Sequence, residues 1–379
     1  MALFALATLA IFDIGSVSAS FVFGAVLILL SLKDFNFYFK PRGLTRLLLL
    51  FVVVALIGLV FTEVPATKTT PIRVLQLIYW FLLTVFVYNT YEYIDKILLS
   101  KVVFFAALLF ITLDVTFMDI SQNAVAFTVI IMGPLGYYFL KKYLFKVAYA
   151  ILLVLLILFN GSRTGAILAF LQTVLFFFLF TPVLQKYVKL LLFSLIFFAI
   201  SLNLNPLRTS LGKFVYPINQ RVGELLINPD YVFRNDMSWL QRKAQVNKGL
   251  QIFKLHPLTG IGIFNFPQYE MDIDISNIET TRTLRNIENR SAHNTYIALL
   301  AETGLPGLSL VIIIFLSALL PFIKQLNKLG STFEGCVFIS FIGLLAYFYN
   351  ISAFYGSSSW LIYGLITGSA NFIKFKNYH

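Results

Sequence analysis

Long apolar runs separated by short polar breaks dominate the sequence. A helix that crosses about 30 Å of hydrocarbon needs roughly 20 apolar residues. Runs near this length give twelve candidate spans, although the first is short: 1–12, 17–32, 44–61, 71–90, 97–114, 124–140, 143–159, 163–181, 187–203, 304–324, 333–352 and 359–375. The pattern therefore predicts an all-α integral membrane protein with about 12 transmembrane helices.

One long hydrophilic stretch, residues 204–292, interrupts this pattern. It divides the chain into transmembrane helices 1–9 in residues 1–203, a large loop in 204–292, and transmembrane helices 10–12 in 293–379. The loop contains eleven Lys and Arg, eight Asp and Glu, and many aromatic side chains, which favours an ordered cap over a flexible linker. We expect one membrane domain with one large, partly helical external loop.

Residues 237–255 of this loop are predicted to form a helix. Asp236 or Ser238 can cap it by accepting hydrogen bonds from free backbone N–H groups, and His256-Pro257 ends it. One apolar stripe follows the helical period: Trp239, Val246, Leu250 and Phe253. Arg242 lies at the edge of this stripe, where an apolar face would meet a membrane or a pocket.

The distribution of Lys and Arg predicts the orientation. If both termini are cytoplasmic, the short cytoplasmic segments contain fifteen Lys and Arg, and the short outer segments contain only Lys68, Arg73 and Arg163. Basic residues are enriched in cytoplasmic loops of membrane proteins. Residues 204–292 are therefore expected outside the cytoplasmic membrane, and any site that they form would face the outer side.

The composition agrees with a membrane protein and excludes several other classes. Hydrophobic residues make up 59% of the chain and charged residues 12%, about half the charged fraction of a soluble domain. The net charge of +12 follows largely from the orientation signal, so no nucleic-acid partner is expected. A single Cys and three His leave little material for a metal site, and we predict no metal and no cofactor.

The motif Asn160-Gly161-Ser162-Arg163-Thr164-Gly165 opens the span that begins at residue 163. Ser162 can cap the helix while Arg163 enters its first turn. A helix N-terminus already has a partial positive charge, so an Arg there suits a bound anion such as phosphate. The alternative is an Arg that extends toward lipid headgroups.

Two further residues could take part in chemistry: Arg242 within the external loop, and His293 where the loop returns to the membrane. Arg242 could bind a diphosphate together with Arg163, because a guanidinium group can form two parallel hydrogen bonds to phosphate oxygens. Alternatively, Arg242 could be a solvated residue of its helix. His293 could act as a base near neutral pH, or form a structural hydrogen bond.

Glu302 lies nine residues further, about half a turn around a straight helix, so we expect it to face away from His293 and to hold the glycine-containing break beyond it.

These stretches together resemble the O-antigen ligase and polymerase superfamily of bacterial envelope enzymes. The resemblance covers roughly residues 160–325 and rests on the order and spacing of three motifs. They are Ser162-Arg163-Thr164-Gly165, then Arg242 followed by His256-Pro257-Leu258-Thr259-Gly260-Ile261-Gly262, then His293-Asn294-Thr295-Tyr296 followed by Glu302-Thr303-Gly304-Leu305.

The resemblance implies a metal-independent, inverting glycosyltransferase of the bacterial inner membrane. Its donor would be a glycan on undecaprenyl diphosphate, its acceptor a hydroxyl of the lipid A–core, and membrane lipid would surround it. Arg163 and Arg242 would bind the diphosphate with help from Ser162, and His293 would act on the acceptor hydroxyl. Further candidates for the site are Arg221, Asn294 and Glu302.

Two alternatives remain open from the sequence. A polymerase would use a second lipid-linked glycan as acceptor; some polymerases have an Arg followed by ten residues and a Gly in external loops, and residues 204–292 contain no such pair. A polysaccharide transporter or flippase is the second alternative. Proton-coupled transporters usually need ionisable groups near the middle of the membrane, whereas the acidic residues within or beside the predicted spans, Asp13, Asp114, Glu302 and Glu334, all lie near span ends.

Overall fold

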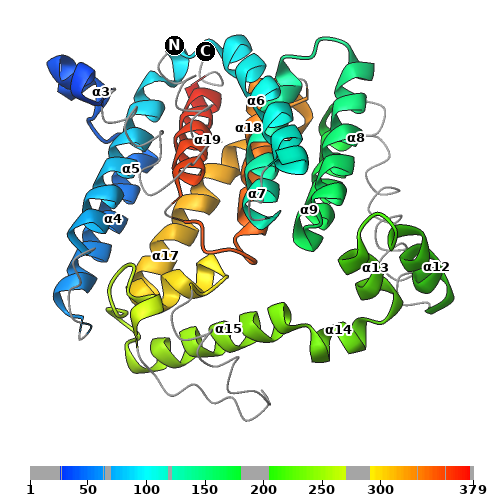
Figure 1. The fold of residues 1–379 in the computed structure, drawn as a ribbon. Coiled ribbons are helices and arrows are strands. Elements are labelled where there is room, and N and C mark those ends of the chain that lie inside the picture. The colour runs from blue at the N-terminus through cyan, green and yellow to red at the C-terminus, as the bar shows by residue number, and fades with distance from the viewer. Residues whose placement is uncertain are drawn as a thin grey trace. The chain divides into compact units, whose positions relative to one another are not determined.

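The computed structural model describes residues 26, 28–62, 64, 70–117, 122–180, 205–269, 291–330, 332–354 and 356–375. These residues fall into two compact units. The first unit contains those of Ile94–Asn235 and Phe322–Tyr347, and the second contains those of Phe21–Tyr93, Asp236–Pro321 and Phe348–His379. Figure 1 shows the course of the chain and the labels of its helices.

The part of the chain that the structure describes is helical and contains no strand, so the all-α prediction is confirmed. Three described helices are long and apolar enough to cross a membrane: Thr70–Tyr93, Tyr143–Asn160 and Thr295–Lys324. Shorter apolar helices are Leu44–Val60, Val125–Tyr138, Arg163–Leu179 and Phe333–Tyr347. Twelve spans are not confirmed, and the predicted spans 1–12, 187–203 and most of 17–32 lie outside the described residues.

The first unit is a bundle of apolar helices. Its members are α6 (Lys96–Phe117), α7 (Gln122–Met132), the 3-10 helix η3 (Gly133–Tyr138), α8 (Tyr143–Asn160), α9 (Arg163–Phe180) and α18 (Phe333–Tyr347). Helix α9 packs against α7, α8 and α18. Gln172 of α9 connects these neighbours, because its Nε2 donates to the carbonyls of Ile130 at 2.9 Å and Ile339 at 3.1 Å.

Two predicted spans of the first unit are shorter in the structure than in the sequence pattern. The run 124–140 is divided, because α7 ends at Met132 and Gly133-Pro134 opens η3; proline cannot donate the backbone hydrogen bond of a continuing α-helix. The run 333–352 ends at Tyr347, where α18 stops. The first unit also contains three short helices of the external loop: α12 (Asn205–Val215), α13 (Gln220–Ile227) and α14 (Pro229–Asn235).

The second unit contains the helices that surround the end of the external loop. They are α4 (Leu44–Val60), α5 (Thr70–Thr90), α15 (Met237–Leu255), the greater part of α17 (Thr295–Lys324) and α19 (Ser357–Phe375). Helix α5 packs against α4 and α19, and the hydroxyl of Thr84 donates to the carbonyl of Trp360 at 3.0 Å. The light-green helix α15 runs crosswise to the blue helices α4 and α5 (Figure 1).

Helix α15 confirms the predicted limits of the loop helix. Asp236 caps it by accepting from the N–H of Trp239 at 3.0 Å, and His256 follows its last residue. The buried face, however, is not the apolar stripe, because Trp239 is 39% exposed while Lys248 is 1% exposed. The ammonium of Lys248 lies 5.3 Å from the centroid of the Phe266 ring, a cation–π contact on the packed face.

Candidate active site

The turn between α8 and α9 positions Arg163 in the first unit. Gly161 ends α8 with a left-handed backbone (φ 85°), a conformation that glycine adopts without steric cost. The buried hydroxyl of Ser162 accepts from the N–H of Gly165 at 3.2 Å and lies 3.2 Å from the amide oxygen of Asn123. The structure therefore confirms that Ser162 caps α9 and that Arg163 occupies its first turn.

Helix α13 begins beside this turn. The side chain of Asn219 caps α13 by accepting from the N–H of Val222 at 3.0 Å, and its Nδ2 donates to the carbonyl of Leu158 at 3.1 Å. Because Leu158 lies in the last turn of α8, the N-terminus of α13 is fixed near the end of that helix. Arg221, an exposed residue in the first turn of α13, thus belongs to the same region of the first unit as Arg163.

The start of α17 is held by an ordered loop, residues 348–353, in the second unit. Asn294 caps α17 by accepting from the N–H of Ile297 at 3.1 Å. The N–H of Thr295 donates to the carbonyl of Phe348 at 2.8 Å, and its hydroxyl donates to the carbonyl of Ile351 at 2.5 Å. Thr295, two residues after His293, is therefore held through both its backbone N–H and its hydroxyl.

His293 has an unusual backbone conformation. Its φ is +48°, and among the described non-glycine residues only His293 and Phe264 have a positive φ. Histidine enters this region more readily than most residues, and such positions concentrate at functional sites. The half-buried imidazole thus projects from a sharp turn that the capped start of α17 keeps in place.

Arg242 of α15 reaches the same loop. Its Nη1 donates to the amide oxygen of Asn350 at 3.1 Å. Since Asn350 lies between Phe348 and Ile351, which both bind Thr295, loop 348–353 connects Arg242 to the turn of His293. The sequence motifs of α15 and α17, about fifty residues apart, are therefore brought to one place in the second unit.

The predicted site residues belong to two sets. The first unit contains Ser162, Arg163 and Arg221, and the second contains Arg242, His293, Asn294 and Glu302. Two of these residues, Ser162 and Asn294, have clear structural roles as helix caps. Among the described residues, no group of three His, Cys, Asp or Glu is arranged to hold a metal ion.

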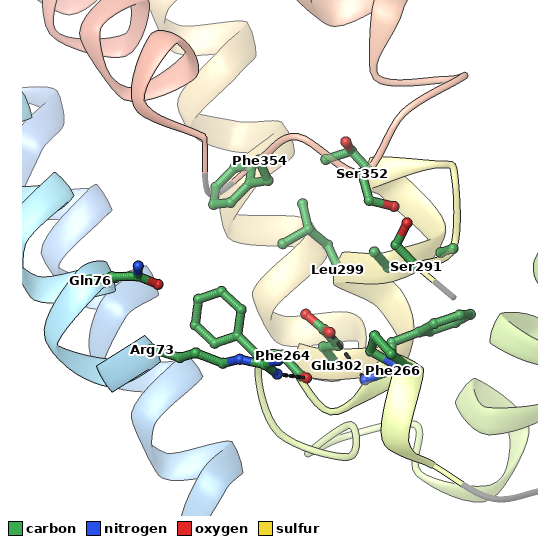
Figure 2. Close-up of a pocket in the computed structure, with 13 residues that line it drawn as sticks. Arg73, Gln76, Phe264, Phe266, Ser291, Leu299, Glu302, Ser352 and Phe354 are labelled. Carbon is green, nitrogen blue, oxygen red and sulfur yellow. Dashed lines mark hydrogen bonds between the residues drawn. The ribbon is translucent and has the colours of Figure 1, made fainter. Parts of the chain in front are cut away.

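A pocket of about 240 Å³ lies beside the start of α17 in the second unit (Figure 2). Its polar lining residues are Arg73, Gln76, Ser291, Thr295, Glu302 and Ser352. The rings of Phe264, Phe266 and Phe354 supply much of the apolar lining. The pocket is thus mainly apolar with a few polar groups, the usual character of a small-molecule site.

Glu302 holds the loop that forms one wall of this pocket. Its Oε1 accepts from the backbone N–H of Phe266 at 3.2 Å, and the neighbouring carbonyl of Ala301 accepts from the N–H of Ile261 at 3.0 Å. Gly260, at φ +62°, packs so closely that a Cβ atom there would overlap the carbonyl of Glu302. The side chain of Glu302 thus holds the loop of Phe266, whereas the kink of α17 lies at Gly304 and the N–H of Leu305 beyond it donates to the carbonyl of Pro257. That Glu302 holds this break stays a prediction.

The relation of Glu302 to His293 differs from the predicted geometry of one straight helix. Helix α17 begins at Thr295, so His293 precedes it. Glu302 lines the pocket, and so do Ala292 and Thr295, which precede and follow His293 in the chain. His293 itself is not among the lining residues. The pocket is therefore adjacent to the His293 turn although the two side chains do not share it.

Sequence reasoning missed Arg73 as a residue of this region. Its Nη1 donates to the carbonyl of Phe264 at 2.7 Å, and its guanidinium carbon lies 5.7 Å from the centroid of the Phe264 ring. These contacts hold Phe264 in its positive-φ conformation (φ 65°). The available signal was that Arg73 is one of few basic residues in the predicted outer segments, but its partner lies 191 residues away.

Residues 148–312 match a family model described as O-Antigen ligase. The matched range includes the α8–α9 turn, Arg242, the His293 turn and Glu302. No curated protein matches the chain.

Proposed function

We propose that the chain is an O-antigen ligase-like glycosyltransferase, because residues 148–312 match a family model described as O-Antigen ligase. In this proposal it moves a glycan from undecaprenyl diphosphate to a hydroxyl of the lipid A–core on the periplasmic side of the inner membrane. The observation that best supports the proposal is loop 348–353, which joins Arg242 to the turn of His293 within one unit.

Arg163 and Arg242 are proposed to bind the diphosphate of the donor. A lipid diphosphate keeps its tail in the bilayer and its charge at the interface. Arg163 stands at the N-terminus of the apolar helix α9, where the helix dipole adds to its positive charge. Arg242 is oriented by Asn350. Positive groups that are already in place stabilise the charge that develops on a leaving diphosphate.

His293 is proposed to act on the acceptor. A sugar hydroxyl is a poor nucleophile near neutral pH, so a base that removes its proton during attack accelerates the reaction. The acceptor oxygen would form a bond to the anomeric carbon while the bond to the diphosphate oxygen breaks. The diphosphate would leave with the bonding electrons and His293 would take the proton. A single displacement of this kind inverts the anomeric configuration and needs no metal.

Replacing Arg242 with alanine is expected to lower kcat/KM for the donor about 10- to 100-fold, because hydrogen bonds to charged groups contribute roughly 1.5–3 kcal/mol. Asn350→Ala should cause a smaller loss of the same kind, since it removes only the group that orients Arg242. The measurement is transfer by purified protein at varied donor concentration. Lys243→Ala, an exposed neighbour on α15, is the control. Unchanged donor kinetics in Arg242→Ala would contradict the assigned role.

Deletion of the gene in its native host tests the overall proposal. We expect surface lipopolysaccharide with core but no added glycan, together with long polymer retained on undecaprenyl diphosphate. Core that carries a single repeat unit, without long polymer anywhere, would instead identify a polymerase. Repeat units trapped on the cytoplasmic side would identify a flippase and would remove the basis for the catalytic assignments.

A further inference from the structure

We infer that the pocket lined by Arg73, Phe264, Glu302 and Ser352 is the subsite for one neutral pyranose ring of the acceptor glycan. Assigning the ring to the acceptor rests on the proposed function. Binding of a sugar in the pocket does not, because it follows from the shape and chemistry of the pocket. The two parts of the inference can therefore be tested separately.

The size and lining of the pocket suit a single sugar ring. Its volume of about 240 Å³ is below the roughly 300–1,000 Å³ of pockets for drug-sized ligands. Figure 2 shows the rings of Phe264 and Phe354, the side chain of Leu299 and the carboxylate of Glu302 around one space. A pyranose has apolar C–H faces and a rim of hydroxyl groups, so it can pack against the rings while its rim meets polar groups.

Polar groups for such a rim are present in the wall. Glu302 is only 4% exposed, and a carboxylate has about four lone-pair positions, so it can accept from sugar hydroxyls besides the N–H of Phe266. The buried hydroxyl of Ser352 has no hydrogen-bond partner within the described ranges. Because buried polar groups are normally hydrogen-bonded, a ligand hydroxyl is a suitable partner for Ser352.

The charge of the pocket favours a neutral ligand over a phosphate. Among the described residues of the lining, Arg73 is the one cation and Glu302 is the one anion. The guanidinium of Arg73 is already directed at the carbonyl and the ring of Phe264. A buried carboxylate in the wall would repel a phosphate or a carboxylated sugar, whereas it attracts the hydroxyl donors of a neutral ring.

The location favours the acceptor over the donor. Ala292 and Thr295 line the pocket, and His293 and Asn294 stand between them in the chain. A ring in this pocket would therefore lie next to the residue proposed to accept the proton of the attacking hydroxyl. Glu302 and Ser352 would act as specificity residues that select which acceptor hydroxyl reaches His293.

The test uses the purified full-length protein in detergent with methyl β-D-glucopyranoside and methyl β-D-galactopyranoside as probes. Saturation-transfer NMR is expected to detect saturable binding of at least one hexoside. Glu302→Gln should weaken it about tenfold or more, and Ser352→Ala about two- to tenfold. Glu334→Gln, which alters a carboxylate paired with Lys96 in the first unit at 2.7 Å, should leave binding unchanged. Ser352→Ala provides an independent test if Glu302→Gln fails to fold.

Transfer kinetics separate this inference from the proposed function. In a transfer assay, Glu302→Gln and Ser352→Ala should raise KM for the acceptor and leave KM for the donor unchanged, a difference that a general loss of structure does not produce. Hexoside binding that depends on Glu302, in a protein without transferase activity, would support the sugar pocket and remove the acceptor role. The inference would be overturned by any of three results. They are no hexoside binding, displacement of the hexoside probe by inorganic phosphate, and an unchanged KM for the acceptor in both folded variants.

Discussion

Replacing His293 with alanine is expected to lower the rate of glycan transfer by about 10²–10⁴-fold, the range that a general base typically contributes. The protein should remain in the membrane, because His293 precedes α17 and the cap of that helix is Asn294. The measurement is transfer of undecaprenyl-diphosphate-linked glycan to lipid A–core by purified variants at matched amounts of protein.

The backbone of His293 requires a second variant. Alanine is strained at φ +48°, so part of its effect could come from the turn. Asparagine adopts this conformation readily but cannot act as a base, so His293→Asn should be nearly as inactive as His293→Ala. His256→Ala is the matched control, since His256 ends α15 and pairs with the hydroxyl of Tyr269 at 3.1 Å. High activity in His293→Asn would show that only the backbone of residue 293 matters.

Replacing Arg163 with alanine is expected to lower transfer by about 10²–10³-fold, as removal of one preorganised charge-stabilising group does in other enzymes. The fold should survive, because Ser162 rather than Arg163 caps α9. Arg163→Lys should recover only part of the activity, since lysine retains the charge but not the two-pronged geometry that matches phosphate oxygens.

The control for Arg163 is Arg234→Ala, which removes an exposed arginine at the end of α14. It should transfer glycan at close to the wild-type rate. The rate is measured at saturating donor, and donor binding is measured separately, because a residue that stabilises the leaving diphosphate lowers kcat as well as affinity. Wild-type transfer by Arg163→Ala, at matched expression, would remove Arg163 from the site.

Local signals in the sequence predict the helices well. The limits of α4, α8, α9 and α15 lie within two residues of the predicted ones, and the caps at Ser162 and Asp236 are confirmed. These features depend on apolar run length and on hydrogen bonds between residues three or four positions apart. Run length and local hydrogen bonding are properties of a short stretch of chain, so they can be predicted without knowledge of the rest of the fold.

The packed face of α15 is less readable from local pattern. The apolar stripe with Trp239 and Leu250 does not identify the face that packs on protein, because the structure buries Gln245, Lys248 and Ile252. In a membrane protein, an apolar side chain can face either lipid or protein, so apolar periodicity does not identify the side of a helix that packs on protein. The contact between Lys248 and Phe266 depends on a loop that follows the helix.

The sequence by itself therefore determines an all-helical chain with membrane character, and it identifies Arg163, Arg242 and His293 as candidates, because run length, caps and motif order are properties of neighbouring residues. Only the tertiary structure joins Arg242 to the His293 turn through loop 348–353, and only it brings Arg73 to Phe264. These contacts connect residues 108 and 191 positions apart. They arise when separate helices and loops pack together, which no local spacing encodes.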